Sequence, residues 1–286
     1  MKPRVALETT LLLHGVPREQ AVSLNRELGD IVRARGAVPA LVGVVGGVPT
    51  VGLIDAQLAA MLAAPRIPKI NTASIGLAMH RRWHAATTVS ATMELAAGAG
   101  IRVFATGGLG GVHRDLATRL DISADLAAFT RFPVAVVASG CKSLLDVIGT
   151  REMLETLGIP VVGFQTDRFP AFYLRDGGVP VDERFDDAAD LAAFARTELA
   201  RTGRGIVVCN PVPAAHELKA ADWALWMAKA ADRAKGQGAA GRDVTPAVLS
   251  ALHEISGGKT LAANIALVKS NSDLAAQLAV EMAKPA

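Results

Sequence analysis

Short, mostly apolar runs recur along the chain, and most of them are separated by stretches with helical spacing. These runs lie at residues 37–45, 101–105, 133–138, 161–164 and 206–209. A run that is apolar at consecutive positions suits a strand buried on both faces, as in a parallel sheet covered by helices. The alternation of such strands with helices therefore predicts an α/β protein, with an α/β/α layered fold around a largely parallel central sheet.

The chain is predicted to form one domain over residues 1–286, because no internal repeat and no low-complexity linker divides it. The first strand is expected at residues 5–7. Helices are predicted at about residues 17–35, 87–99, 121–129 and 143–157. Pro49 is expected to delay a further strand to about residues 50–53. The irregular stretch at 168–187 is interpreted as a surface excursion or an active-site flap.

Composition and charge argue against several classes of partner. The chain has 30 basic and 27 acidic residues, with no basic run and no aromatic residues interleaved with basic ones, so we expect no nucleic-acid partner. No apolar run approaches the ~20 residues that a membrane span requires, and the first residues have no signal-peptide layout. Cys141 and Cys209 give neither a disulfide framework nor a metal-type spacing. We therefore expect a cytoplasmic protein.

Lys142 is the strongest single candidate for chemistry. It follows the apolar run at 133–138 and so lies near the carboxyl end of a predicted strand, where ligand crevices form in open α/β sheets. A lysine buried in apolar surroundings has a lowered pKa, which makes its neutral amine available as a nucleophile. The alternative is a lysine that extends from a strand end to solvent.

A Gly-rich turn at residues 106–111 is the second candidate. Glycines after a strand let backbone amides approach an anion, and His113 and Arg114 would add positive charge. The turn lacks the third glycine of a dinucleotide fingerprint and the Gly-Lys-Ser/Thr ending of a P-loop. A tight structural turn is the simpler alternative.

Several polar residues beside apolar runs remain ambiguous from pattern alone. Asp121, Ser123 and Asp125 place two carboxylates and a hydroxyl within five residues; a helix cap by Asp121 is favoured over a hard-cation site. Glu8 ends the first strand and is either an acid or base with a raised pKa or a surface carboxylate. Other open cases are Lys69, Asn210 and Asn264.

These separate signals occur together in one known family. The segments that carry the resemblance are ALETT at 6–10, HGVP at 14–17, TTVSATM at 87–93, VFATGGLGGVHR at 103–114, DISADL at 121–126, GCKSLLD at 140–146, NPVP at 210–213, TP at 245–246 and GGKTLAANIALV at 257–268. Their order and lengths resemble the pseudouridine-5′-phosphate glycosidase family, which also contains proteins linked to indigoidine biosynthesis. The resemblance spans nearly the whole chain.

The resemblance implies reversible cleavage of the C–C glycosidic bond of pseudouridine 5′-phosphate to uracil and ribose 5-phosphate, with a divalent metal such as Mn²⁺ and a homotrimeric assembly. A carbon leaving group has no oxygen to protonate, so the two-carboxylate route of ordinary glycosidases fits poorly. An imine (Schiff base) between a lysine and the opened sugar supplies an electron sink instead.

The resemblance also assigns roles by position. It gives Lys142 as the lysine that forms the imine at C1′ and Glu8 as the proton donor. Asp121 would be the one protein ligand of a largely water-coordinated metal. The implied substrate contacts are Lys69, the backbone of Val89, Ser123, Ala124, Asp125, His113 and Asn264. Of these, Lys69 and His113 are expected near the phosphate, and Asn264 would hydrogen-bond to uracil.

One segment departs from the family pattern. After its lysine the family usually reads Ser-Arg-Arg-Asp, whereas here Lys69 is followed by INTAS at residues 70–74. Both arginines are missing, which removes possible phosphate or subunit contacts. The nearby segment RRWH at residues 81–84 is an alternative source of positive charge.

Two other functions stay open beside the C-glycosidase. One is an imine-forming lyase on another phosphosugar, which would use the same lysine and which the missing arginines motivate. The other is a non-catalytic phosphosugar-binding accessory protein. The joint presence of Glu8, Asp121 and Lys142 argues against the latter.

Overall fold

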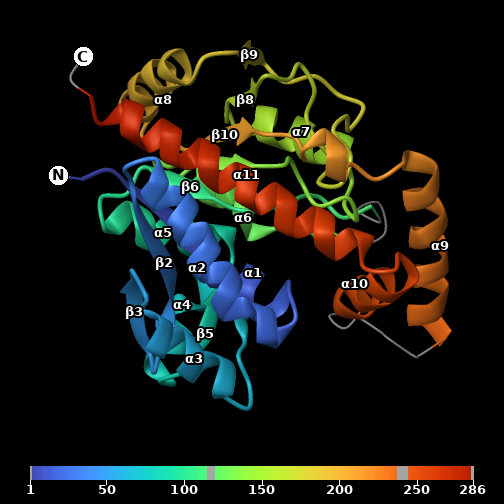
Figure 1. The fold of residues 1–286 in the computed structure, drawn as a ribbon. Helices are drawn as coiled ribbons and strands as arrows, with labels where there is room; N and C mark the ends of the chain where they lie inside the picture. Colours follow the sequence, from blue (N-terminus) through green and yellow to red (C-terminus); the bar gives the residue numbers. More distant parts are fainter. Residues whose placement is uncertain (1, 115–119, 237–243, 285–286) are drawn as a thin grey trace.

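The computed structural model describes residues 2–114, 120–236 and 244–284. Within these ranges, ten strands join in one sheet with the order β4-β5-β2-β1-β6-β7-β10-β8-β9, and β3 pairs with β2 (Figure 1). The strands are β1 (Arg4–Glu8), β2 (Val38–Val45), β3 (Val48–Val51), β4 (Lys69–Ile70), β5 (Ala85–Thr87), β6 (Val103–Ala105), β7 (Ala135–Ala138), β8 (Val161–Phe164), β9 (Glu183–Phe185) and β10 (Ile206–Cys209). Neighbouring strands from β2 to β9 along this order are parallel, and β2 is antiparallel to β3 and β5. The predicted, largely parallel α/β fold is confirmed.

Helices cover both faces of the sheet. They are α1 (Thr9–His14), α2 (Arg18–Ala34), α3 (Asp55–Ala63), α4 (Ile75–His80), α5 (Val89–Gly98), α6 (Ala124–Phe129), α7 (Val147–Thr156), α8 (Ala188–Thr202), α9 (Ala220–Gly236), α10 (Val244–Ile255) and α11 (Lys259–Met282), with short 3-10 turns at Thr72–Ser74 and Ala214–His216. No helix in the described part of the chain is long and apolar enough to cross a membrane.

Alternate residues of the strands enter two separate cores. Along β1, Val5 and Leu7 join a buried cluster with residues of α2, α8 and α11, whereas Ala6 joins a second cluster with residues of α5, α6 and α7. This alternation follows from the two-residue repeat of a strand. Because both sets are apolar, the strand sequences are apolar at consecutive positions, which explains the pattern that predicted the sheet.

Helix α11 is the central element of one face. Its 24 residues run across the front of the sheet in Figure 1, and it packs on β1, β6 and β7 between α2 and α8. Two buried polar residues of this helix, Asn264 and Asn271, face the carboxyl edge of the sheet. That edge collects the ends of β1, β6, β7 and β10.

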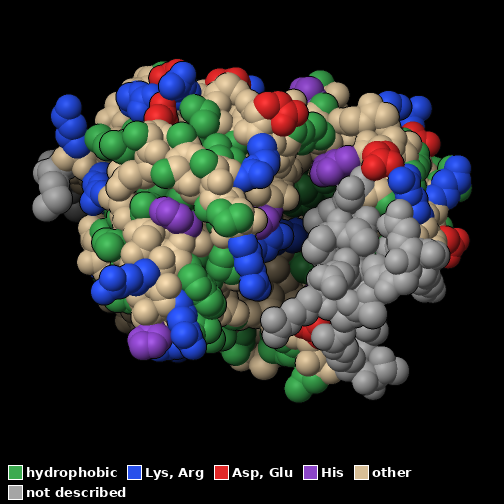
Figure 2. All heavy atoms as spheres, turned by 90° about the horizontal axis from the view of Figure 1, so that it is seen from below, with side chains coloured by type: hydrophobic (Ala, Val, Ile, Leu, Met, Phe, Trp, Pro, Cys, Tyr) green, Lys and Arg blue, Asp and Glu red, His purple; other side chains and the backbone are tan. Residues whose placement is uncertain are grey.

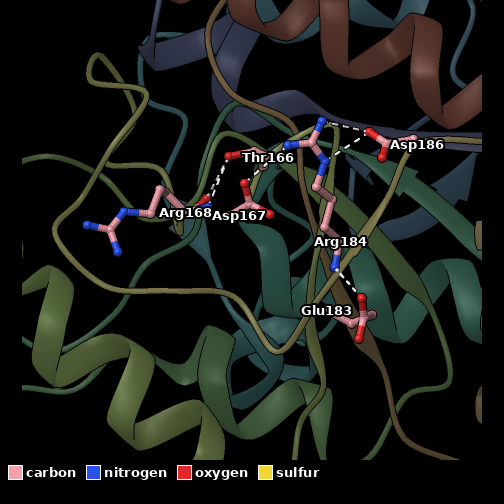
Figure 3. Close-up of polar contacts among 6 residues, drawn as sticks. All are labelled: Thr166, Asp167, Arg168, Glu183, Arg184 and Asp186. Carbon is pink, nitrogen blue, oxygen red and sulfur yellow. Dashed lines mark hydrogen bonds and ion pairs between the residues drawn. The ribbon is translucent and has the colours of Figure 1, made fainter.

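The excursion predicted at 168–187 is a loop that also contains β9, a strand that the sequence did not indicate. Figure 3 shows how Arg184 holds its two ends together: the guanidinium contacts Asp167 at 3.1 Å and Asp186 at 2.8 Å. These side chains are exposed, so each pair contributes little to stability. The backbone of Arg168 also donates to the hydroxyl of Thr166 at 3.1 Å.

Some predicted boundaries are wrong for local reasons. Pro49 lies inside β3 and does not delay it; β3 pairs only with β2, and an edge strand tolerates a residue without an N–H. The helix predicted from residue 143 begins at Val147, because Asp146 caps it by accepting from the amide of Gly149. The helix predicted from Asp121 begins at Ala124, and Ser123 rather than Asp121 is its cap.

Candidate active site

Glu8 is the last residue of β1 and lies half-buried at the carboxyl edge of the sheet. The hydroxyl of Thr106, which follows β6, donates a hydrogen bond to its carboxylate. Burial raises the pKa of Glu8 to about 7, although the positive charge of Lys142 opposes this shift. A carboxyl group with a pKa near neutrality can both give and take a proton under physiological conditions. The predicted strand-end position and raised pKa are therefore found.

Lys142 lies in the loop after β7, as expected from the sequence. Its backbone amide donates to the carbonyl of Leu109 at 3.0 Å, so the loop is attached to the Gly-rich turn. Gly140 makes this path possible: its φ is +67°, and a Cβ there would lie 1.7 Å from the carbonyl oxygen of Pro170. The side chain of Lys142 is exposed. Of the two interpretations that the sequence left open, this exposure fits a lysine that extends from a strand end toward solvent, and its neighbours include charged groups.

Lys69 and Glu8 are those charged neighbours. Partial burial and then the charge of Lys142 hold the pKa of Lys69 below its usual value, while Glu8 acts in the opposite direction. The charges of two lysines therefore act on one carboxyl group at the edge of the sheet. In the space-filling view from below, basic and histidine side chains gather beside a hollow near the middle of the face (Figure 2).

His14 belongs to the same neighbourhood and was not selected from the sequence. It is the last residue of α1, the short helix that follows Glu8. Burial, together with the charge of Lys69, lowers its pKa to about 4, although a backbone hydrogen bond with Ile67 opposes the shift. The imidazole is therefore neutral at pH 7. Its place in the HGVP segment was the available signal.

Asp125 joins three segments around the Gly-rich turn. Its carboxylate accepts from the amides of Ser90 and Gly110, both at 2.9 Å, and the residue is 4% exposed. A Cβ on Gly110 would lie 2.3 Å from the Ser123 hydroxyl oxygen, so this glycine is required by the close approach of α6. The Gly-rich turn at residues 106–111 therefore has a structural role, which was the simpler alternative to anion binding.

Other predicted substrate contacts lie around this junction. Val89 and Ala124 are the first residues of α5 and α6, where backbone N–H groups have no acceptor within their own helix. The hydroxyl of Ser123 accepts from the amide of Asp125 at 3.2 Å. Direct substrate contacts by Val89, Ser123, Ala124 and Asp125 remain predictions.

Asp121 and His113 lie together on adjacent segments. The backbone amide of His113 donates to the carbonyl of Asp121 at 3.0 Å. Among the residues that the structure describes, no group of three or more His, Cys, Asp or Glu side chains is arranged to hold a metal ion. Asp121 offers a single carboxylate, and a site built on it would suit an ion that keeps most of its water ligands.

Asn264 has an unsatisfied atom. Its side-chain amide nitrogen donates to the carbonyl of Gly15 at 3.3 Å, which fixes the orientation of the amide. Its Oδ1 is buried and has no hydrogen-bond partner. A buried acceptor without a donor is costly unless a ligand or water supplies one.

A network of buried amides holds the strand ends in place. The side-chain nitrogen of Asn271 donates to the carbonyl of Thr106 at 2.7 Å and contacts the Ser139 hydroxyl at 3.2 Å. Asn210 donates to Oδ1 of Asn271 at 2.9 Å and to the hydroxyl of Ser270 at 3.0 Å. Both hydrogens of the Asn210 amide are used in this way, so Asn210 is a structural amide.

The segment that departs from the family pattern forms a closed turn after Lys69. The side chain of Asn71 accepts from the amide of Ala73, and the hydroxyl of Ser74 accepts from the amide of Asn71, both at 3.1 Å. The segment at 81–84 lies beside another turn: a Cβ on Gly47 would contact Arg82, and the amide of Gly46 donates to His84 at 3.3 Å.

The fold brings a lysine and a protonatable carboxyl group to the carboxyl edge of a parallel sheet, which is where α/β enzymes hold their ligands and reacting groups. A family model described as indigoidine synthase A like protein matches residues 1–281. The chain belongs to this indigoidine synthase A-like family.

Curated relatives and solved structures agree with this assignment. The chain is 50% identical to a pseudouridine-5′-phosphate glycosidase of Methylobacterium nodulans, over 98% of the chain and 83% of the relative. It is 44% identical to one of Solibacter usitatus, over 98% and 94%. An indigoidine synthase A-like protein of Thermotoga maritima superposes with a TM-score of 0.90 at 37% identity, over 98% of this chain and 93% of the other. The prealnumycin C-glycosynthase AlnA, in complex with ribulose 5-phosphate, gives 0.90 at 35%, over 98% and 91%.

Proposed function

We propose that this chain reversibly cleaves the C–C glycosidic bond of pseudouridine 5′-phosphate, giving uracil and ribose 5-phosphate. The observation that carries the proposal is the nearness of Glu8, at the end of β1, to Lys142, in the loop after β7, because the charge of Lys142 lowers the pKa of the Glu8 carboxyl. The names of relatives that are 42–50% identical support the same substrate.

The two residues divide the proton and electron transfers between them. As the amine of Lys142 bonds to C1′, the bond from C1′ to the ring oxygen breaks, and Glu8 supplies the proton that this oxygen takes up. The Glu8 carboxylate then takes a proton from the bonded nitrogen, which regains its lone pair. This lone pair forms the imine as the C1′–uracil bond breaks, and the electrons of that bond move to the uracil carbon, which takes the proton back from Glu8. Water finally hydrolyses the imine and releases ribose 5-phosphate.

Release of uracil is the direct test. The purified protein is incubated with pseudouridine 5′-phosphate and Mn²⁺, and uracil is quantified by chromatography, with the unphosphorylated nucleoside as a comparison substrate. We expect uracil from the phosphate ester and much less from the nucleoside. No uracil release from the ester at any neutral pH would contradict the proposal.

A divalent metal, Mn²⁺ in our proposal, would be held by Asp121 and water. When bound it would supply positive charge to substrate oxygens. The half-buried Asp121 carboxylate supports such a site, as does its link through His113 to the Gly-rich turn. Lys69 and His113 are proposed to bind the phosphate, and Asn264 to accept a hydrogen bond from uracil, which its unpaired Oδ1 supports.

A homotrimer in the cytoplasm is the proposed state of the protein. Exposed apolar side chains on β3, α4 and the following turn, Val48, Leu77, Met79 and Trp83, support burial against another copy. The two free, buried cysteines support a reducing compartment. A solution mass of three chains of 29.7 kDa, measured by light scattering, is expected.

A second candidate is an imine-forming reaction on another phosphosugar. Likeness to the C-glycosynthase AlnA in complex with ribulose 5-phosphate favours it, together with the closed turn that replaces the arginines after Lys69. This second function would be favoured if ribulose 5-phosphate formed an adduct with the protein while pseudouridine 5′-phosphate released no uracil.

A further inference from the structure

Phe172 has a backbone conformation that is unusual for a bulky residue. Its φ is +60°, and among the described non-glycine residues only Arg82 and Gln165 share a positive φ. The left-handed region brings Cβ too close to the backbone carbonyl, so a phenylalanine occupies it at a cost. Such outliers persist where the surroundings fix them, and they concentrate at ligand sites.

The surroundings of Phe172 do fix it. Its amide donates to the carbonyl of Ser139 at 2.9 Å, and its ring meets the ring of Tyr173 edge-on, with centroids 4.7 Å apart. The ring lies on the Gly-rich turn: a Cβ on Gly108 would be 2.5 Å from its Cδ2. The absence of a side chain at Gly108 therefore makes room for the ring of Phe172.

The ring of Phe172 and the unpaired acceptor of Asn264 both lie beside Gly107. A Cβ on Gly107 would be 3.3 Å from Cε2 of Phe172 and 3.5 Å from Oδ1 of Asn264. Gly107 directly follows Thr106, whose hydroxyl binds Glu8. A largely buried aromatic ring and a buried acceptor that lacks a donor thus lie near the proton donor of the proposed reaction.

We propose that Phe172 is a specificity-determining residue: its ring is the wall against which the planar base of the substrate packs, beside the acceptor that takes a base N–H. The residue would discriminate for a flat, N–H-bearing ring on C1′ and would have no part in the chemistry at the sugar. This inference rests on the proposed function, because it assigns the base half of that substrate.

Two reactions of the same protein distinguish contacts with the base from contacts with the sugar. Uracil release from pseudouridine 5′-phosphate needs both halves of the site, whereas borohydride trapping of ribose 5-phosphate needs only the sugar half. Phe172→Leu keeps an apolar side chain but removes the aromatic face. We expect kcat/KM for uracil release to fall about tenfold, in line with the loss of base–aromatic contact, and the trapping rate to stay within about twofold.

Phe169→Leu is the matched control, because Phe169 is fully buried in the same loop. We expect it to change uracil release and trapping by the same factor. Thermal melting of both variants identifies any unfolding, and Phe172→Tyr, which keeps the aromatic face, should restore most of the lost uracil release.

Equal losses in both reactions for Phe172→Leu, or no loss in either, would overturn the inference. A wild-type protein that traps ribose 5-phosphate yet releases no uracil would instead count against the proposed function, so the two failures are distinguishable.

Discussion

The protonation of Glu8 links the chemistry of the site to the stability of the fold. Its pKa is about 7 in the folded protein, against an ordinary value of 4.5. Between these values the folded state binds more protons than the unfolded state, so the free energy of unfolding falls as pH rises. Above pH 7 the protein therefore maintains an unfavourable, half-buried carboxylate, as expected of a group that transfers protons.

Glu8→Gln tests this account at one residue. The amide cannot donate a catalytic proton, so uracil release should fall by a factor of about 10²–10⁴. The variant should melt higher than wild type at pH 8, and this difference should shrink as pH falls from 7 to below 4.5, where Glu8 becomes protonated in both states. Melting curves across that range measure the effect.

The exposed Glu152 on α7 supplies the control. Glu152→Gln should give a difference in melting temperature that does not grow over the same pH range. A melting difference for Glu8→Gln that is constant between pH 4.5 and 8 would show that the Glu8 carboxyl titrates normally.

At the residue scale, the sequence allowed prediction of those candidate residues whose position follows a simple rule. Glu8 and Lys142 lie at carboxyl ends of strands, and that rule predicted both. The rule could not predict the surroundings of the side chains. The exposure of Lys142 and the unpaired Oδ1 of Asn264 depend on packing between segments that are far apart in sequence. His14 was missed for the same reason: its neighbour Lys69 comes from another element.

At the scale of elements, the Gly-rich turn depends on close approach as much as on flexibility. Gly110→Ala would place a methyl group 2.7 Å from Oδ2 of Asp125 and closer still to Ser123. We expect a loss of about 2–4 kcal/mol in the free energy of unfolding, with lower activity, because overpacking displaces the start of α6. Gly98→Ala on α5 meets nothing within 4 Å, and should be neutral or slightly stabilising in the same urea titrations.

The Asn271 network is a second test at this scale. Asn271→Leu leaves the buried carbonyl of Thr106 without its donor and removes one of the two acceptors of the Asn210 amide. We expect a loss of about 2–4 kcal/mol, since each buried polar group left unpaired costs about 1–3 kcal/mol. Ser270→Ala removes one contact of the same Asn210 amide, and should cost about 1 kcal/mol or less. Equal effects from the two variants in urea unfolding would contradict a central role for Asn271.

For the whole molecule, composition and periodicity were enough to predict an α/β fold with a parallel sheet. They did not indicate the short strands β4 and β5, which have two and three residues and are held by pairing with segments distant in sequence. The order of the strands could not be predicted from the sequence pattern either, because β1 lies between β2 and the sequence-distant strand β6. That order brings Glu8, Thr106 and the Lys142 loop to one edge, so the site depends on long-range pairing.

The central claim is that Lys142 forms the covalent bond to the sugar. The direct measurement is peptide mass spectrometry of the protein after incubation with ribose 5-phosphate and reduction by borohydride. We predict one reduced adduct, located on Lys142 and absent from Lys142→Ala, while Lys284→Ala near the carboxyl end of α11 retains it. An adduct on Lys69 in place of Lys142, or no adduct in an enzyme that releases uracil, would contradict the account.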